Sequence, residues 1–366
     1  MLLTNKEEIV FTTVATAGYL PQATVMAKSV KKHMPGTKVI VCIVEKKVPP
    51  KTESILNTCF DEIILAKNLG FTNFNQFIFQ YNRFEGANAC KAQLLIHLLE
   101  NNKNHNFIIF LDADTKVYGP FFELAECLKT SEIVFSPHFI RFNKKQPFTH
   151  LGTVHRSGIF NTGYLAIKRG NESHKFLQWW AKILLKHCYK DLQKGLWNEQ
   201  KWLDLTTGLF NYFIQTDPGY NVGPWNFHER LLTLDSNGEY LVNGKPLCLF
   251  HFSGLYSNYF NHEIEKSDHN QKSIINKIRK QYLQDLQETN IGLSRNQWSY
   301  NCFINGHQID KESRLIYRNK PGLFKDLDNP FLKDNQFFKL TLKRRNNKEI
   351  SKKTKGSFKT VEKNLQ

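Results

Sequence analysis

The sequence contains no apolar run long enough to cross a membrane, so it predicts no membrane-spanning helix. Its first residues, Met1–Glu8, have no basic stretch followed by an apolar one, so they do not predict a signal peptide. It also has no C-x-x-C pair, and its seven cysteines are an odd number, scattered mostly through apolar segments. Such cysteines are typical of reduced, buried thiols. We therefore expect a cytoplasmic protein.

Acidic residues are fewer than basic residues in this sequence. The 366 residues hold 33 Asp and Glu against 50 Lys and Arg, which gives a formal net charge of +17. An excess of this size indicates an anionic partner, such as a nucleotide diphosphate, an anionic membrane or a nucleic acid. No helix-turn-helix, zinc-finger or aromatic RNA-binding signature accompanies the basic residues, so we expect no nucleic acid.

Much of the positive charge lies in residues 341–366, which hold nine basic and two acidic side chains. This composition predicts a disordered tail. The tail can be a solvated chain end. It can also attract the protein to an anionic membrane, where each base near the lipid is worth about 1 kcal/mol. A peripheral contact with the inner face of the cell membrane is therefore one of two open interpretations.

Strand-like and helix-like segments alternate from the start of the chain, which is typical of an α/β fold with a mostly parallel central sheet flanked by helices. The expected strands are Ile9–Val14, Lys38–Val44, Glu62–Ala66, 107–111, Ile133–Ser136, Ile159–Ile167 and Leu247–Phe252. The expected helices are Ala23–His33, Lys51–Thr58, Ala87–Glu100, Phe121–Leu128, Ser173–Lys186 and Glu263–Gln287. Residues 139–157 predict a loop. We expect an α/β domain at 1–256, a helical and irregular extension at 257–340, and the basic tail at 341–366.

The apolar run 107–111 ends abruptly at Asp112-Ala-Asp114. Ligands of open α/β sheets bind outside the carboxyl ends of the strands, where two carboxylates can hold a divalent cation against a diphosphate. The pattern alone is weak, because about one Asp-x-Asp occurs by chance in a chain of this length. Such a pair can also cap a helix or form a turn. The buried strand that leads into it favours the metal site.

Four blocks together resemble the GT-A nucleotide-diphospho-sugar transferases, and specifically the retaining glycosyltransferases of family eight. The resemblance covers roughly residues 8–256. The blocks are Phe11–Tyr19, Ala89–Leu95, Asp112-Ala-Asp114 with Leu249–Gly254, and Phe160–Tyr164 with Asn198–Asp204. The resemblance implies a GT-A (Rossmann-like) fold and a nucleotide-sugar donor, with a UDP-sugar expected although the first loop lacks the acidic residue that many relatives use to read uracil.

The resemblance also implies roles for individual residues. The donor-binding residues it implies are Thr13, Ala15, Tyr19, Lys91, Asp112 and Gly254. The metal ligands it implies, for Mn²⁺ or Mg²⁺, are Asp112, Asp114 and His251. The alternatives are an ordinary turn for the first loop, a solvent-facing Lys91 and a histidine packed in the core. The family's downstream Lys-Pro-Trp is absent, since Leu255-Tyr-Ser-Asn follows instead.

The same resemblance places Asn161, Glu199 and Gln200 around the reacting sugar, with Glu199 where the family has Asp. A neutral amide oxygen such as that of Gln200 can stabilise an oxocarbenium-like centre without trapping a covalent adduct. Glu199 and Gln200 can alternatively cap or pair on a helix surface. We expect these three residues to be catalytic.

The stretch from Asp217 to His228 combines rigid Pro and Gly with stacking aromatics and amides. Sugar recognition uses flat apolar faces and directional hydrogen bonds, so this stretch is a candidate acceptor wall. The acceptor-binding residues we expect are Asn221, Trp225, Asn226 and His228. A well-packed structural loop is the alternative.

These observations predict a metal-dependent glycosyltransferase that moves a sugar from a nucleotide-sugar, with retention, to a glycan or lipid-linked acceptor in cell-surface polysaccharide synthesis. A sugar-1-phosphate nucleotidyltransferase shares the sheet and the metal chemistry. Such an enzyme usually opens with a Gly-rich loop followed by Arg and Lys, which Ala15-Thr-Ala-Gly-Tyr19 does not provide. A non-catalytic glycan- or membrane-binding protein on the same scaffold is the other alternative.

Overall fold

A computed structural model describes residues 8–141 and 148–345. The described residues fall in two compact units, the first within Met1–Gly70 and Glu85–Trp298 and the second within Phe71–Phe84 and Ser299–Gln366. Most of the predicted basic tail, residues 346–366, lies outside the described residues. All seven cysteines are free thiols, and six of them are buried.

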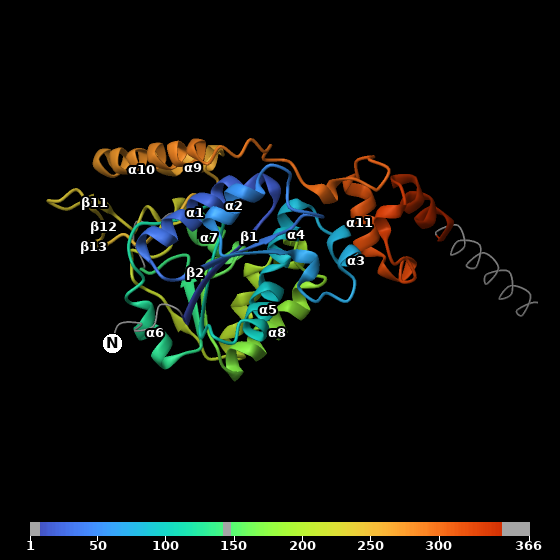
Figure 1. The fold of residues 1–366 in the computed structure, drawn as a ribbon, viewed down its shortest axis with the longest axis horizontal. Coiled ribbons are helices and arrows are strands. Elements are labelled where there is room, and N and C mark those ends of the chain that lie inside the picture. Colours follow the sequence, from blue (N-terminus) through green and yellow to red (C-terminus); the bar gives the residue numbers. More distant parts are fainter. Residues whose placement is uncertain (1–7, 142–147, 346–366) are drawn as a thin grey trace, which may run out of the picture. The chain divides into compact units, whose positions relative to one another are not determined.

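The first unit is built on a seven-stranded sheet (Figure 1). Its strands, in spatial order, are β10 (Phe213–Ile214), β6 (Ile133–Pro137), β7 (Phe160–Lys168), β4 (Phe107–Leu111), β1 (Ile9–Ala15), β2 (Lys38–Ile43) and β3 (Glu62–Leu65). Neighbouring strands from β4 to β3 pair in parallel, whereas β7 runs antiparallel to both β4 and β6. The predicted α/β class with a mostly parallel sheet is therefore confirmed.

The apolar character of β1 explains its central position in the sheet. Every residue of its sequence, IVFTTVA, is buried, as expected for a parallel strand covered on both faces. On one face α5 (Lys91–Asn101) and α8 (Asn171–Leu184) pack against each other. On the other, α1 (Leu20–His33) packs on β1 and β2 and also contacts α10 (His269–Glu288) (Figure 1).

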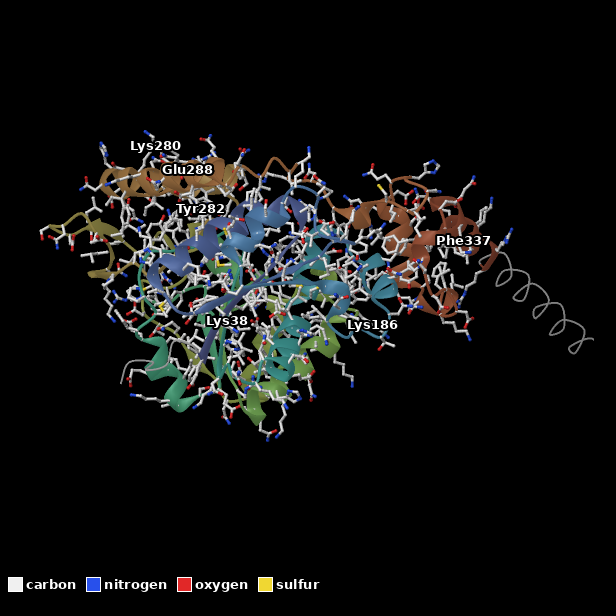
Figure 2. All side chains as sticks on the ribbon, in the orientation of Figure 1. Lys38, Lys186, Lys280, Tyr282, Glu288 and Phe337 are labelled. Atoms are coloured by element: carbon white, nitrogen blue, oxygen red, sulfur yellow. The ribbon has the colours of Figure 1, made fainter. Side chains whose placement is uncertain are left out.

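A short antiparallel pair extends from the end of β4. Strand β5 (Thr115–Val117) pairs with β14 (Leu249–His251), with His251 opposite Thr115. The next residue, Phe252, stacks on Tyr282 of α10 with ring centroids 3.6 Å apart and an interplanar angle of 2°. Tyr282 is fully buried on the inner side of α10, whereas Lys280 lies on its outer side (Figure 2). Helix α10 therefore supports the strand that carries His251.

Three predicted segments differ from the observed elements. Part of the loop expected at 139–157 is the helix α7 (Phe148–Ser157), which was missed because its Thr, Val and Gly residues have low helix propensity. The helix expected at Ala87–Glu100 is two helices, α4 (Arg83–Ala89) and α5. The helix expected at Glu263–Gln287 is α9 (Asn258–Glu265) followed by α10, because Asp268 accepts a hydrogen bond from the Gln271 N–H and starts a new helix.

Further elements complete the described chain. The remaining helices are α2 (Glu53–Cys59), α3 (Phe74–Phe79), α6 (Leu124–Thr130) and α11 (Lys311–Asn319). The remaining strands are β8 (Lys190–Asp191), β9 (Leu196–Trp197), β11 (Leu232–Leu234), β12 (Tyr240–Val242) and β13 (Lys245–Pro246). Throughout residues 8–141 and 148–345, the helices are too short or too polar to span a bilayer.

Candidate active site

Asp112 and Asp114 lie in the turn that links β4 to β5. The Asp112 N–H donates to the Gly163 carbonyl at 3.0 Å, which ties the turn to β7. The Phe252 N–H donates to the Asp114 carbonyl at 2.8 Å, which ties it to the end of β14. The backbone on both sides of the turn is therefore fixed, and both carboxylates stay at the carboxyl end of β4.

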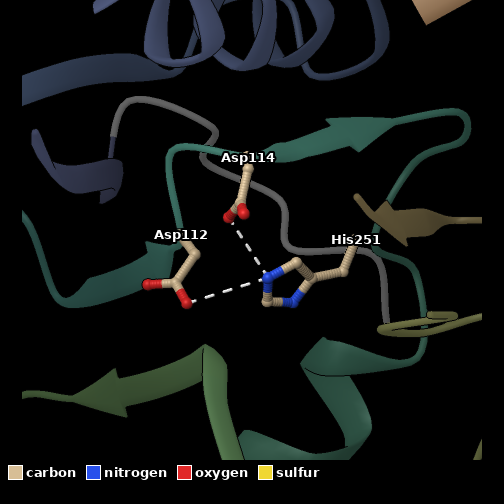
Figure 3. A group of neighbouring side chains, drawn as sticks. All are labelled: Asp112, Asp114 and His251. Carbon is tan, nitrogen blue, oxygen red and sulfur yellow. Dashed lines mark ion pairs between the residues drawn. The ribbon is translucent and has the colours of Figure 1, made fainter. Parts of the chain in front are cut away.

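The three predicted metal ligands converge (Figure 3). His251 Nε2 lies 3.2 Å from Asp114 Oδ1 and 3.9 Å from Asp112 Oδ2. One ligand atom from each residue can be chosen so that all lie within 4.8 Å of one another. Two carboxylate oxygens and one imidazole nitrogen form a donor set that suits Mn²⁺, and two hard oxygens alone suit Mg²⁺. The residues present therefore fit a divalent cation.

Lys91 is buried at the start of α5 and does not face solvent. Its ammonium lies 2.8 Å from Asp112 Oδ1 and 2.9 Å from Glu199 Oε1, and it donates to Thr162 Oγ1 at 3.2 Å. Burial opposes the charged form, but the carboxylates of Asp112 and Glu199 outweigh it and raise the pKa of Lys91. Lys91 is therefore a permanent cation that fixes one oxygen of Asp112.

The charged side chains of the site carry an excess of negative charge. Asp112, Asp114 and Glu199 supply three negative charges against the single positive charge of Lys91, so two negative charges remain when His251 is neutral. Burial raises the pKa of the Asp112 carboxyl in spite of the nearby ammonium. Burial also acts to raise the pKa of the Asp114 carboxyl, but His251 beside it, when protonated, outweighs that effect and lowers the pKa. A divalent ion would match the remaining charge.

Of the three residues predicted to be catalytic, Glu199 contacts Lys91 of this cluster directly, and Gln200 follows it in the chain. Glu199 is buried and accepts hydrogen bonds from Lys91 and, at 2.7 Å, from Thr162 Oγ1. Gln200 is half-buried, and its Nε2 donates to the Ser157 carbonyl at 2.9 Å. That bond fixes the amide plane of Gln200.

Asn161 lies on β7, and its Oδ1 accepts from the Gly163 N–H at 2.9 Å. Its Nδ2 lies 3.3 Å from Nε2 of His138, whose Nδ1 lies 3.2 Å from the Ile159 carbonyl. Burial lowers the pKa of His138 to about 4, so this imidazole is neutral near pH 7. Asn161 is therefore held by backbone and side-chain contacts beside the predicted ligands.

The predicted acceptor residues have different surroundings. Asn221 and Asn226 are fully buried, and their amides bond inside the protein. Trp225 is half-buried and packs edge-on against the His251 ring with centroids 5.1 Å apart, and its Nε1 has no partner within the described residues. His228 is half-buried beside His150, and burial lowers its pKa to about 4. Trp225 and His228 are thus the two that reach partly exposed surface.

The predicted nucleoside loop follows β1. Thr13 and Ala15 are buried in the strand, and Tyr19 is half-buried where α1 begins. Gly254 follows β14 and has a left-handed backbone, with φ of +68°. A Cβ at Gly18 would lie 2.2 Å from the Arg295 carbonyl oxygen, so the segment that follows α10 runs directly over this loop.

Sequence reasoning missed Glu45, which lies shortly after β2, the neighbour of β1. Its carboxylate is buried and accepts a hydrogen bond from the Ala17 N–H at 2.8 Å. The signal was available, because a charged residue that follows the apolar run Lys38–Val44 lies at the same sheet edge as Asp112. The loop thus has a carboxylate from the adjacent strand, although none in its own sequence.

A family model and a curated relative match parts of this chain. The model of the family described as Glycosyl transferase family 8 matches residues 10–256. The Bacillus subtilis (strain 168) protein YfnF, described as uncharacterized, is 28% identical over 173 residues, which cover 45% of this chain and 54% of that protein. The matched part therefore spans about half the length of that relative.

Among solved structures, the galactosyltransferase LgtC in complex with donor and acceptor sugar analogs covers 76% of this chain and 95% of its own, with 14% identity and a TM-score of 0.45. The glycosyltransferase GlyE of Streptococcus pneumoniae TIGR4 covers 76% of this chain and 62% of its own, with 14% identity and a TM-score of 0.44.

The α/β sheet with an acidic pair at the carboxyl end of β4 is the architecture expected of a GT-A nucleotide-sugar transferase. The chain belongs to glycosyl transferase family 8, because the family model matches more than half of it. This family is one of glycosyltransferases, which is the enzyme class that the match indicates for the chain.

Proposed function

We propose that this enzyme transfers a sugar from a UDP-sugar, with retention and with Mn²⁺ or Mg²⁺, to a glycan or lipid-linked acceptor in cell-surface polysaccharide synthesis. The convergence of Asp112, Asp114 and His251 beside the buried Lys91 is the observation that carries the proposal. Glu45 supports a uracil base, because a carboxylate at the nucleoside loop can accept the imide N–H that cytosine lacks.

Each group of residues in the site has a separate role in the proposed reaction. A bound divalent ion would neutralise the charge that develops on the departing diphosphate. Lys91 holds Asp112 and Glu199 in place, and its ammonium adds positive charge near the phosphates. Gln200 offers Oε1 toward the reacting carbon, where a neutral oxygen stabilises positive charge. Trp225 and His228 provide the partly exposed surface for the acceptor.

A donor screen tests the proposal. The protein is incubated with Mn²⁺ and each of several UDP-, GDP- and CDP-sugars, and the released nucleotide is measured. We expect slow release of UDP that stops when EDTA is added. Release of pyrophosphate from a nucleoside triphosphate and a sugar 1-phosphate would instead support the nucleotidyltransferase alternative. No metal-dependent release from any sugar nucleotide would contradict the proposal.

Replacing Gln200 by Ala should slow turnover with little change in nucleotide affinity. An interaction made mainly in the transition state lowers the turnover number more than it lowers binding. Calorimetry with UDP and Mn²⁺, beside a donor-hydrolysis assay, separates the two quantities. The exposed Gln193→Ala is the matched control. An equal loss of affinity and turnover would make Gln200 a binding or folding residue.

Removing residues 346–366 tests the proposed membrane contact of the basic tail. This deletion removes six lysines and two glutamates, and it leaves all the residues that the structure describes, 8–141 and 148–345, in place. Co-sedimentation with anionic vesicles should be lost while donor hydrolysis is unchanged. Binding of the full chain should weaken with salt, because exposed charges are screened over about 8 Å at physiological ionic strength. Vesicle binding that survives the deletion would leave the tail as a solvated chain end.

A further inference from the structure

The hydrogen bonds behind His251 have a fixed direction. The Gly163 N–H donates to one atom of the Asn161 amide at 2.9 Å, and a backbone N–H can only donate, so that atom is oxygen. The Asn221 amide lies 3.0 Å from the same oxygen and must therefore present its NH₂ group there. The oxygen of Asn221 is then the atom 3.1 Å from Nδ1 of His251.

We propose that Asn221 is a positioning residue that keeps a proton on Nδ1 of His251, so that Nε2 is the nitrogen left to bind the ion. The inference rests on the proposed role of His251 as a metal ligand. A carboxamide oxygen can only accept, and Nδ1 must donate to satisfy it. Metal-binding histidines generally donate their other ring N–H to such a group, which fixes both the tautomer and the orientation of the ring.

The surroundings of Asn221 hold its amide in this orientation. Asn221 is completely buried, and its Nδ2 also donates to Ser136 Oγ at 3.1 Å. Its backbone has φ of +56°, a left-handed conformation that Asn tolerates better than most residues. A rotated amide would place the oxygen of Asn221 against the oxygen of Asn161, which already accepts from the Gly163 N–H, and the bond between the two amides would be lost.

Gly163 holds the His251 ring from another side. A Cβ at this position would lie 2.3 Å from Cε1 and 2.5 Å from Nδ1 of His251. Only a residue without a side chain lets the ring lie directly against β7. The segment Asn161-Thr-Gly163 therefore serves His251 in two ways, because it orients Asn221 and leaves space for the imidazole.

Two substitutions of Asn221 isolate its role as an acceptor. Asn221→Gly and Asn221→Asp both remove the hydrogen bonds that Nδ2 donates to Ser136 and Asn161, but only Asn221→Asp keeps an oxygen for Nδ1 of His251. Glycine fits the left-handed backbone without strain. Asn243→Gly is the control for general effects of such a substitution on the fold. Asn243 also has a left-handed backbone, and its side chain accepts from the Leu231 N–H and donates to the Glu229 carbonyl.

The readouts are the Mn²⁺ dissociation constant of the nucleotide-free protein and the pulsed-EPR nitrogen coupling of saturated Mn²⁺. We expect Asn221→Gly to weaken Mn²⁺ binding by about 10- to 100-fold and to lose or alter the imidazole coupling. Asn221→Asp and Asn243→Gly should stay close to the wild type in both. Equal losses in Asn221→Gly and Asn221→Asp, or an unchanged coupling in Asn221→Gly, would overturn the inference. A wild type without Mn²⁺ or without nitrogen coupling would instead overturn the metal site of the proposed function.

Discussion

Replacing Asp114 by Asn should reduce Mn²⁺-dependent nucleotide release about 1,000-fold. Asn keeps the shape of the side chain but removes one of the negative charges that converge with His251. A catalytic metal supplies several kcal/mol of charge stabilisation, and about 1.4 kcal/mol corresponds to a tenfold change in rate. The measurement is UDP release with Mn²⁺ held well above its wild-type dissociation constant, and then again at tenfold higher Mn²⁺.

The matched control is Asp235→Asn in the turn between β11 and β12. Asp235 Oδ1 accepts from the backbone N–H groups of Asn237 and Glu239, and an Asn oxygen can accept both. This variant should keep wild-type activity. If Asp114→Asn retained more than about one tenth of the activity at both Mn²⁺ concentrations, the carboxylate would not be essential to the reaction.

Replacing Lys91 by Met should destabilise the protein by about 3–5 kcal/mol and also abolish turnover. The Lys91 side chain is 3% exposed, and its ammonium contacts two carboxylates, Asp112 and Glu199. Met fills a similar volume but leaves both carboxylates without their cation. Urea unfolding measures the loss of stability, and the UDP-release assay measures the loss of turnover.

A second substitution separates structure from chemistry at Lys91. Adding Glu199→Gln to Lys91→Met removes the most deeply buried of the unpaired charges and should restore a large part of the stability, because residues in one network are not additive. Turnover should stay absent, since both the positive charge near the phosphates and the carboxylate of Glu199, itself predicted to be catalytic, are missing. Recovery of both stability and turnover would make Lys91 a purely structural residue.

The apolar run before Asp112 indicated a cation site at the carboxyl end of a strand, and the resemblance to family eight added His251 as a further ligand. Asp112 comes directly after β4, and His251 is the last residue of β14. The pairing of Lys91 with Glu199 could not be predicted in the same way. Those residues are 108 positions apart, and their contact depends on how α5 and the segment after β9 pack.

The proposed positioning of His251 by Asn221 also depends on long-range packing, so it could not be predicted from the sequence. Its sequence context, between Tyr220 and Val222, is that of a loop with polar and aromatic residues suited to binding a sugar. The fold gives Asn221 a left-handed backbone and buries its amide behind His251. A sequence shows that an amide is present, but which of its two ends faces a partner depends on the hydrogen bonds of β7.

Anomalous diffraction from crystals soaked with Mn²⁺ and UDP tests the central claim most directly. The account predicts one strong manganese peak, about 2.0–2.3 Å from an oxygen of Asp112, an oxygen of Asp114 and Nε2 of His251, with the diphosphate completing its coordination. A manganese peak elsewhere, or UDP bound at the end of β4 with no peak between these three side chains, would contradict it.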